Sequence, residues 1–326
     1  MKKISIVVPT YNEEENVVAV SQALTKEMSK FQTYDYEILF IDNDSKDCTR
    51  DLIRKLCEND KHIKAIFNTK NFGPNNSPLY GLVQSTGDCA ILFCADFQDP
   101  VNMIPVLIQE WENGYKIVSC IKTTSQENKI VRFLRTCYYK LIKKISEVEQ
   151  IEHFTGFGLY DREFLSIMAS LKDPMPFLRG IVAEFGYKRK EVPYEQQKRR
   201  AGKSSFNFYK YYDMAMLSFT SYTKIGLRLA TFGGFIIAFL SLLVALIYFV
   251  MKIVRWNTFS MGTAPILIGM FFLGAVQLVF LGLLGEYVLS INARAMNRPW
   301  VIEEERINFD EHTIEPKNED NENGLN

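Results

Sequence analysis

The sequence has little of what marks several large classes of protein. Its 38 lysine and arginine residues balance 38 aspartate and glutamate residues, so the formal net charge is zero. No long basic run is present, and we therefore expect no binding to DNA or RNA, which depends on neutralising phosphate charge. The three histidines lie far apart, and the six cysteines form no CxxC pair. These absences argue against a structural zinc site and indicate reduced thiols in a cytoplasmic domain.

Long apolar runs are the first positive feature, and both lie in the last third of the chain, at about residues 229–251 and 264–290. At about 1.5 Å per residue, the first run forms a helix roughly 34 Å long, enough to cross a hydrocarbon core about 30 Å thick. A buried helical hairpin in a soluble domain is the alternative, and Gln277 and Glu286 weaken the second run slightly. We expect two transmembrane helices within residues 225–293.

Basic residues flank these runs. Lys198, Arg199, Arg200, Lys203, Lys210, Lys224 and Arg228 precede the first, Lys252 and Arg255 lie between the two, and Arg294 and Arg298 follow the second. This bias predicts a multi-pass protein of the cell membrane with its N-terminal domain in the cytoplasm. Residues 206–224 mix aromatic side chains with lysine, which is typical of an amphipathic helix at a lipid interface. Residues 294–326 are acidic and rich in asparagine, and we predict a disordered cytoplasmic tail.

The first 205 residues alternate between short apolar runs and segments with helical spacing. We expect strands at residues 4–8, 36–41, 63–68, 89–94, 116–121, 152–160 and 186–194, and helices at 13–30, 47–58, 77–85, 103–112 and 129–145. Alternation of this kind predicts an α/β domain with a mostly parallel sheet. In such sheets the loops at the carboxyl ends of the strands carry the ligand site.

Polar residues gather in three of these loops. Residues 10–15 follow the first strand, Asp42, Asn43 and Asp44 follow the second, and Asp96, Gln98 and Asp99 follow the fourth. Carboxylate and amide oxygens accept hydrogen bonds from a base or ribose, and they ligate hard cations such as Mg²⁺ or Mn²⁺. Aspartate is also common in ordinary turns, where it bonds its own backbone, so each loop alone is open to that simpler interpretation.

Six motifs occur in a fixed order: VVPTYNEEENV, ILFIDNDSKDCT, NFGPNNSPLYGLVQSTGD, CADFQDP, FTGFGLYDREF and KRRAGKSSFNFY. In this order, and followed by two apolar runs, they resemble the family 2 glycosyltransferases of the polyprenyl-phosphate glucosyltransferase and dolichol-phosphate mannose synthase type. The resemblance extends to about residue 295. It implies a GT-A-like domain at residues 1–205 that transfers a sugar from a nucleotide-sugar to a polyprenyl phosphate.

The resemblance also assigns roles to residues. It implies a nucleotide-sugar pocket of Pro9, Tyr11, Glu13, Asp42, Asp44 and Asp96, with Asp96 and Gln98 binding Mg²⁺ or Mn²⁺. It implies phosphate or lipid-phosphate binding by Lys122, Arg132, Arg135, Lys198, Arg199, Arg200, Lys203 and Ser204. For the basic loop at residues 198–204, a surface patch that binds anionic membrane lipids is an equal alternative.

Three positions depart from the family pattern. Asn43 and Cys94 stand where many relatives have aspartate, and FTGFG replaces a motif that contains an acid. A thiolate is a poor ligand for Mg²⁺, so Cys94 removes one contact. Asp96 and Asp99 remain as candidate catalytic carboxylates, although Asp99 is also placed to cap the helix that begins after Pro100. A phosphate acceptor is largely ionised at neutral pH and needs little help from a base.

The expected function is inverting transfer of a hexose to undecaprenyl phosphate for the modification of a cell-surface glycan. UDP-glucose is the favoured donor, with UDP-N-acetylglucosamine, UDP-galactose and GDP-mannose as alternatives. A processive polysaccharide synthase is disfavoured because two spans leave no channel for a growing chain. The rival from another class is a weakly catalytic scaffold for a partner transferase or flippase. Glycines in the apolar runs suit packing within the hairpin or between the subunits of a homo-oligomer.

Overall fold

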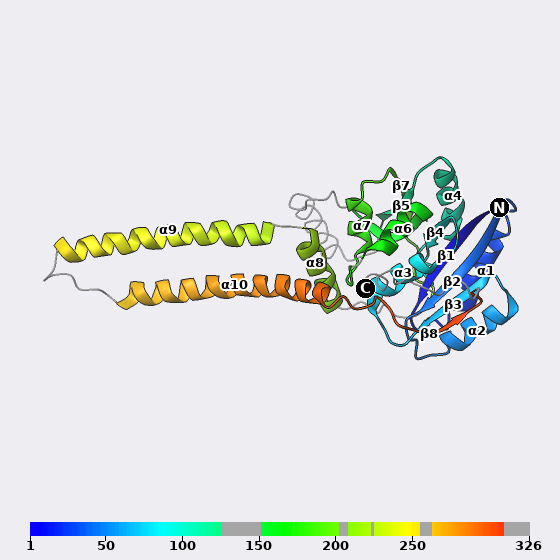
Figure 1. Ribbon diagram of the computed structural model, residues 1–326, viewed down its shortest axis with the longest axis horizontal. Coiled ribbons are helices and arrows are strands. Elements are labelled where there is room, and N and C mark those ends of the chain that lie inside the picture. The colour runs from blue at the N-terminus through cyan, green and yellow to red at the C-terminus, as the bar shows by residue number, and fades with distance from the viewer. Residues whose placement is uncertain (125–150, 172, 202–207, 223–224, 255–262, 310–326) are drawn as a thin grey trace, which may run out of the picture. The chain divides into compact units, whose positions relative to one another are not determined.

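The computed structural model describes residues 1–124, 151–171, 173–201, 208–222, 225–254 and 263–309 (Figure 1). The chain divides into two units. The first comprises Met1–Gln126, Glu152–Ser204 and Pro299–Asn326, and the second comprises Glu127–Ile151 and Ser205–Arg298. The helix expected at residues 129–145 lies outside the described residues.

The first unit contains an eight-stranded sheet with the order β7-β5-β6-β4-β1-β2-β3-β8. Its strands are β1 (Lys2–Thr10), β2 (Tyr34–Asp42), β3 (Ile63–Asn68), β4 (Cys89–Leu92), β5 (Ile117–Thr124), β6 (Phe154–Asp161), β7 (Arg189–Glu195) and β8 (Glu303–Ile307). Strands β3, β2, β1 and β4 are parallel neighbours, and β6 and β8 run antiparallel to β4 and β3. These pairings confirm the prediction of a mostly parallel α/β sheet. Its central strands are buried on both faces, as is usual for parallel strands.

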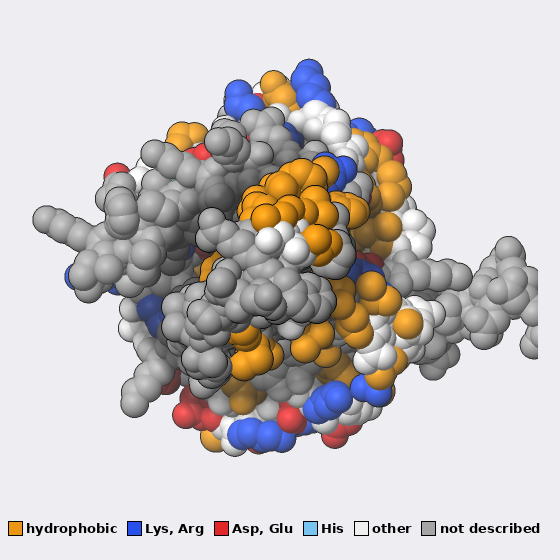
Figure 2. All heavy atoms as spheres, turned by 90° about the vertical axis from the view of Figure 1, so that its left-hand side faces the viewer, with side chains coloured by type: hydrophobic (Ala, Val, Ile, Leu, Met, Phe, Trp, Pro, Cys, Tyr) orange, Lys and Arg blue, Asp and Glu red, His pale blue; other side chains and the backbone are white. Residues whose placement is uncertain are grey.

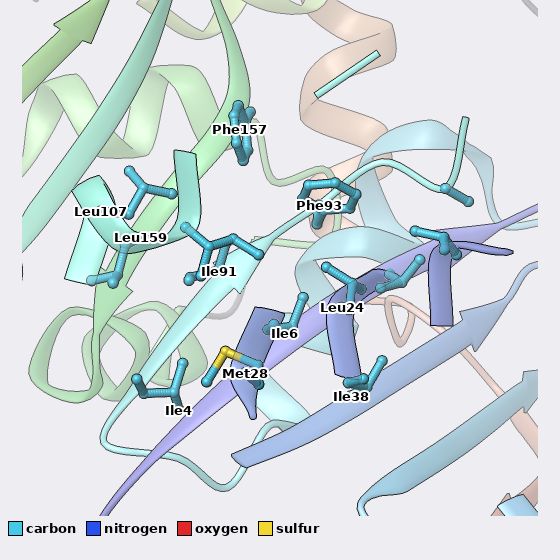
Figure 3. Packing of buried hydrophobic residues seen from close by; sticks show 14 of the residues in the cluster. Ile4, Ile6, Leu24, Met28, Ile38, Ile91, Phe93, Leu107, Phe157 and Leu159 are labelled. Carbon is cyan, nitrogen blue, oxygen red and sulfur yellow. The ribbon is translucent and has the colours of Figure 1, made fainter. Parts of the chain in front are cut away.

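Helices cover both faces of this sheet. They are α1 (Val17–Met28), α2 (Thr49–Asn59), α3 (Gly73–Gln84), α4 (Ile104–Glu112), α6 (Arg162–Ser170) and α7 (Leu178–Glu184), with a short 3₁₀ turn, η1 (Val101–Met103). On one face, alternate strand residues such as Ile4, Ile6 and Ile91 pack against Leu24 and Met28 of α1 (Figure 3). Helix α3 lies on the other face, where a Cβ on Gly81 would come within 2.7 Å of Val7. The absence of a side chain at Gly81 therefore lets α3 approach the sheet closely.

The tail prediction is wrong for residues 303–307, which form the edge strand β8 beside β3. Pairing hides the backbone groups that the edge of β3 would otherwise expose. The polar side chains of β8 also find partners: Glu304 pairs with Arg50 at 2.7 Å, and Glu305 pairs with Arg54 at 2.8 Å. Composition indicated disorder, but the unpaired edge and these arginines order the segment. Residues 310–326 lie outside the described residues.

The second unit contains α8 (Phe208–Tyr222), α9 (Ile225–Val254) and α10 (Thr263–Ala295). By length and composition, one stretch of the described residues, Phe272–Ala295, is apolar enough to cross a membrane. Large apolar side chains of both long helices are exposed, for example Phe235 at 69% and Leu278 at 70%, and hydrophobic side chains gather in the middle of Figure 2. Glu286, the acid within the second apolar run, accepts a hydrogen bond from Tyr212 of α8 at 3.0 Å.

Candidate active site

The polar loops predicted to carry the site lie along one edge of the sheet. Strands β3, β2, β1 and β4 are parallel, so the loops that follow them share the carboxyl edge. Pro9 lies near the end of β1, Tyr11 follows that strand and is 37% exposed, and Asp42 is the last residue of β2. Asp96 follows β4. The fold therefore brings residues from three separate motifs to the same edge.

The Asp42 carboxylate is fully buried and holds its own loop together. It accepts hydrogen bonds from the Thr10 hydroxyl at 3.2 Å and from the Ser45 backbone amide at 3.0 Å. The Nε of Arg50 lies 3.5 Å from its Oδ1. Burial raises the pKa of the Asp42 carboxyl, and these partners oppose that rise. Asp42 thus fixes the shape of the loop in which Asp44 stands with a φ of 67°.

Asn43 is a connecting residue that the sequence pattern did not explain. Its amide nitrogen donates to Asn71 Oδ1 at 3.0 Å and to the Gly73 carbonyl at 3.2 Å. Its oxygen accepts from Asn68 Nδ2 at 3.1 Å and from the Phe72 backbone amide at 2.9 Å. An aspartate cannot donate the first two bonds. The departure from the family pattern therefore ties the loop after β2 to the loop after β3.

Replacing Asn43 with aspartate should destabilise the protein. Two donated bonds are lost, and a carboxylate then faces two acceptor oxygens in a buried position, at a cost of about 2 kcal/mol. The melting temperature in detergent should fall by roughly 4–8 °C. Asp44→Asn is the matched control, because within the described part of the chain Asp44 pairs with the exposed Lys46 alone, and such surface pairs contribute little. Equal melting temperatures for both variants would contradict this account of Asn43.

An arginine joins the loops after β1 and β4. Arg199 Nη2 lies 2.8 Å from Asp96 Oδ2, and Arg199 Nη1 lies 3.9 Å from Glu13 Oε1. Asp96 is 6% exposed, and its other oxygen accepts from the Gln98 backbone amide at 3.1 Å. Burial raises the pKa of Glu13, while Asn16 and Arg199 oppose that rise. The Arg199 guanidinium therefore lies between the carboxylates of Asp96 and Glu13.

The residues next to Arg199 in the chain also contact the loops after β1 and β4. The backbone amide of Gln197 donates to the Gln98 carbonyl at 3.1 Å, and that of Arg200 donates to the Asp96 carbonyl at 3.2 Å. Asn16 Nδ2 donates to the Ala201 carbonyl at 3.4 Å. The guanidinium of Arg200 lies 5.4 Å from the centre of the Phe97 ring. Most of the predicted basic loop that the structure describes therefore lies against the two carboxylate loops.

Lys122, another residue of the predicted phosphate-binding set, is near enough for its charge to act on the Cys94 thiol. Lys122 lies in β5, and its backbone amide donates to the His153 carbonyl at 3.3 Å. An open cavity of about 380 Å³ is lined by Thr123, Tyr194 and Gln197 among others. Arg132, Arg135, Lys203 and Ser204 lie outside the described residues.

Comparison with known proteins identifies the family. A model of the glycosyl transferase family 2 matches residues 5–167. The SfII prophage-derived bactoprenol glucosyl transferase of Shigella flexneri is 34% identical over 298 residues, which are 91% of this chain and 96% of that protein. The chain belongs to glycosyl transferase family 2.

Further relatives of this family 2 chain match along nearly their whole length. The bactoprenol glucosyl transferase of Shigella phage SfV is 33% identical, covering 93% of this chain and 99% of its own. A prophage bactoprenol glucosyl transferase homolog of Escherichia coli K12 is 31% identical, covering 91% and 97%. Among solved structures, glucosyl-3-phosphoglycerate synthase from Mycobacterium tuberculosis, in complex with Mg²⁺ and UDP, matches with a TM-score of 0.47 at 17% identity. That match covers 67% of this chain and 77% of the other.

The predicted metal ligands, Asp96 and Gln98, lie in the loop that follows β4. Among the described residues, no group of three or more His, Cys, Asp and Glu side chains is arranged to hold a metal ion. Mg²⁺ commonly binds through one or two carboxylates and completes its coordination with water and substrate phosphates. Asp96 and Gln98 can supply such a partial set, although Asp96 Oδ2 is here paired with Arg199 Nη2 at 2.8 Å.

Asp99 does not cap a helix, so that interpretation is wrong. The N-cap position of η1 is Pro100, and no side chain makes a capping hydrogen bond there. The Asp99 carboxylate is 2% exposed and accepts hydrogen bonds from the Cys94 backbone amide and the Tyr194 hydroxyl, both at 3.2 Å. Burial raises its pKa to about 6. Tyr194, in β7, is a partner that nothing in the sequence pattern singled out.

Cys94 keeps a neutral thiol in this family 2 site. Cys94 is an exposed residue, although desolvation of its thiol by nearby protein atoms acts on its pKa. This desolvation, followed by the neighbouring Asp99 and Asp96 carboxylates, raises the pKa of the Cys94 thiol well above its usual value. A protonated thiol is a weak ligand for a hard cation such as Mg²⁺.

Proposed function

We propose that this family 2 chain transfers glucose from UDP-glucose to undecaprenyl phosphate at the cytoplasmic face of the cell membrane. One observation carries the proposal: 34% identity over 91% of the chain with a bactoprenol glucosyl transferase. That match extends well beyond the family domain at residues 5–167 and therefore includes most of the segment that contains α8, α9 and α10. Similarity across both parts favours a lipid acceptor over a soluble one.

In this proposal the donor lies along the carboxyl edge of the sheet. The loop shaped by Asp42 and Asn43 receives the nucleoside, with Pro9, Tyr11, Glu13 and Asp44 as its neighbours. Asp96 and Gln98 hold Mg²⁺ or Mn²⁺ near the diphosphate. The cation supplies charge stabilisation for the departing nucleotide. The ordering of these loops by hydrogen bonds supports a site that is largely formed before the donor binds.

The basic loop then serves the phosphate groups. Arg199 and Arg200 lie against the carboxylate loops, and with the preceding Lys198 they offer cations for a diphosphate or an acceptor phosphate. An ionised acceptor oxygen attacks the anomeric carbon, the bond from that carbon to the UDP oxygen breaks, and UDP leaves with the electron pair. Attack opposite the leaving group inverts the configuration. Because the acceptor is already ionised, the main work of the protein is positioning, with Asp96 and Asp99 beside the reacting sugar.

The return of the chain to the sheet supports two membrane crossings by α9 and α10. Residues on both sides of the second unit belong to the first unit, because β8 pairs with β3. A chain that leaves this domain after residue 204 and rejoins it at residue 299 must cross a bilayer an even number of times. Exposed apolar side chains on both long helices fit lipid contact better than water contact. Helix α8 then lies at the interface, next to α10.

Purified full-length protein should transfer label from one nucleotide-sugar to undecaprenyl phosphate. The assay offers labelled UDP-glucose, UDP-N-acetylglucosamine, UDP-galactose and GDP-mannose separately, each with Mn²⁺, and measures label in the lipid phase. We expect label from UDP-glucose alone and loss of nearly all transfer with EDTA. EDTA followed by excess Mn²⁺ is the control and should restore activity. Folded protein that binds UDP but transfers no sugar would instead support the scaffold.

A further inference from the structure

A segment far from the donor loops in sequence contributes to their structure. We call residues 299–308 the C-terminal strap. Trp300 Nε1 donates to the Asp173 carbonyl at 2.6 Å, and the Ile302 carbonyl accepts from the Thr69 backbone amide at 3.0 Å. At the other end, Asn308 Nδ2 donates to the carbonyls of Cys57 and Ile63 at 2.7 and 2.8 Å. The strap is thus fixed at both ends, with β8 between them.

Glu304 of the strap is linked to Asp42 of the donor loop indirectly, because both carboxylates lie near the same arginine, Arg50. Glu304 Oε2 lies 2.7 Å from Arg50 Nη2, and the Nε of the same guanidinium lies 3.5 Å from Asp42 Oδ1. The Arg50 side chain is 17% exposed and lies 5.0 Å above the Phe67 ring. Its position is therefore set by a carboxylate on each side and by an aromatic ring beneath it.

The contact between Arg50 and Asp42 is loose enough to depend on the contact with Glu304. Arg50 Nε is buried and makes no hydrogen bond to any described residue, because 3.5 Å to Asp42 is longer than a good N–H···O bond. Only charge attraction acts across this gap, whereas the bond to Glu304 is short. If Glu304 loses its charge, Arg50 keeps its contact with the Phe67 ring but loses its one short ion pair, so it can shift relative to the buried Asp42.

We propose that Glu304 is a positioning residue of the donor site, which holds Arg50 beside Asp42 and so keeps the loop of Asp42–Ser45 in its binding shape. This role rests on the proposed function, because it assumes that this loop receives the nucleoside. Through this role the C-terminal strap contributes to nucleotide binding. Glu304 itself does not touch the donor.

The neighbouring pair gives a matched control. Glu305 Oε2 accepts hydrogen bonds from Arg54 Nη2 at 2.8 Å and Nε at 3.1 Å, so the next residue of the same strand also pairs with an arginine of α2, and with one bond more than Glu304. Arg54 pairs further with Asp51 at 3.1 Å and makes no contact with Asp42 that parallels the one of Arg50. Losing either glutamate charge should affect β8 similarly, but only the loss at Glu304 should reach the donor loop.

The test compares UDP binding and transfer kinetics for full-length Glu304→Gln, Glu305→Gln, Arg50→Gln and the Glu304→Gln/Arg50→Gln double variant. We expect Glu304→Gln to raise the Kd for UDP and the KM for UDP-glucose about threefold or more, with kcat and the KM for undecaprenyl phosphate unchanged. Glu305→Gln should leave all four values unchanged. Because Glu304 acts through Arg50, adding Glu304→Gln to Arg50→Gln should cause no further loss.

Three results would be decisive against this role. Equal UDP affinity for the two single glutamate variants would overturn it, and so would a full additional loss in the double variant. A lower melting temperature for Glu304→Gln than for Glu305→Gln, with unchanged UDP affinity, would reduce Glu304 to a stabilising residue. Wild-type protein that binds no UDP under the same conditions would instead refute the proposed donor itself.

Discussion

Removing residues 299–326 should destabilise the N-terminal domain severely, although the deletion leaves residues 1–204 intact. The deletion uncovers the edge of β3, whose six residues are all buried, and it removes the bonds of Trp300, Ile302 and Asn308. Backbone and side-chain bonds of this number contribute on the order of 5 kcal/mol in total. The melting temperature in detergent should fall by about 10–20 °C, and the exposed strand should promote aggregation.

A shorter deletion separates the strap from the rest of the tail. Removing residues 310–326 alone keeps β8 and Asn308, and we expect the melting temperature to change by less than about 2 °C. Circular dichroism during heating measures both variants, and size-exclusion chromatography reports aggregation. If the longer deletion melted at the wild-type temperature, the strap would not be a structural part of the domain.

Replacing Asp96 with asparagine should reduce glucose transfer by about 10²–10³-fold while the protein remains folded. Asparagine preserves the size of the side chain but removes the charge that faces Arg199 at 2.8 Å and that we propose faces the cation. Both the bound cation and the orientation of the basic loop then lose an anchor. The measurement is kcat/KM for UDP-glucose at saturating undecaprenyl phosphate, with melting temperature as the test of folding.

Two further measurements sharpen the Asp96 experiment. Asp51→Asn is the control, because Asp51 is 74% exposed on α2 and pairs with Arg54 away from the site. It should retain nearly full activity. Raising the Mn²⁺ concentration should recover part of the activity of Asp96→Asn if weaker cation binding causes the loss. Retention of more than a tenth of wild-type activity without added Mn²⁺ would contradict the role of Asp96.

Sequence patterns predicted the parallel core well because its signals are local. Each central strand is a short apolar run that ends at a polar loop, and buried parallel strands require such runs. The seven strands expected in the first 205 residues are all present within a few residues of their expected bounds. By contrast, β8 has the sequence EEERI, which carries no apolar alternation. Its pairing depends on an edge and two arginines more than 200 residues away.

The candidate site was predictable at the level of loops but not of contacts. The order of motifs placed Asp42 and Asp96 after parallel strands, and the fold brings them to one edge. The Arg199 to Asp96 pair and the Tyr194 to Asp99 bond join residues about 100 positions apart, so no spacing rule reveals them. Asn43 was interpreted as a lost carboxylate because its four hydrogen-bond partners are visible only in three dimensions.

The position of β8 in the chain also sets an order of assembly. The ribosome makes strands β1 to β7 first, then the long apolar helices, and only afterwards the strand that completes the sheet. At about 5–20 residues per second, the delay between residue 204 and residue 308 is roughly 5–20 seconds. During this interval the edge of β3 is uncovered while the long apolar helices α9 and α10 are being synthesised. Completion of the sheet therefore follows synthesis of these helices, and a nascent chain that stalls earlier remains a candidate for chaperones and proteases.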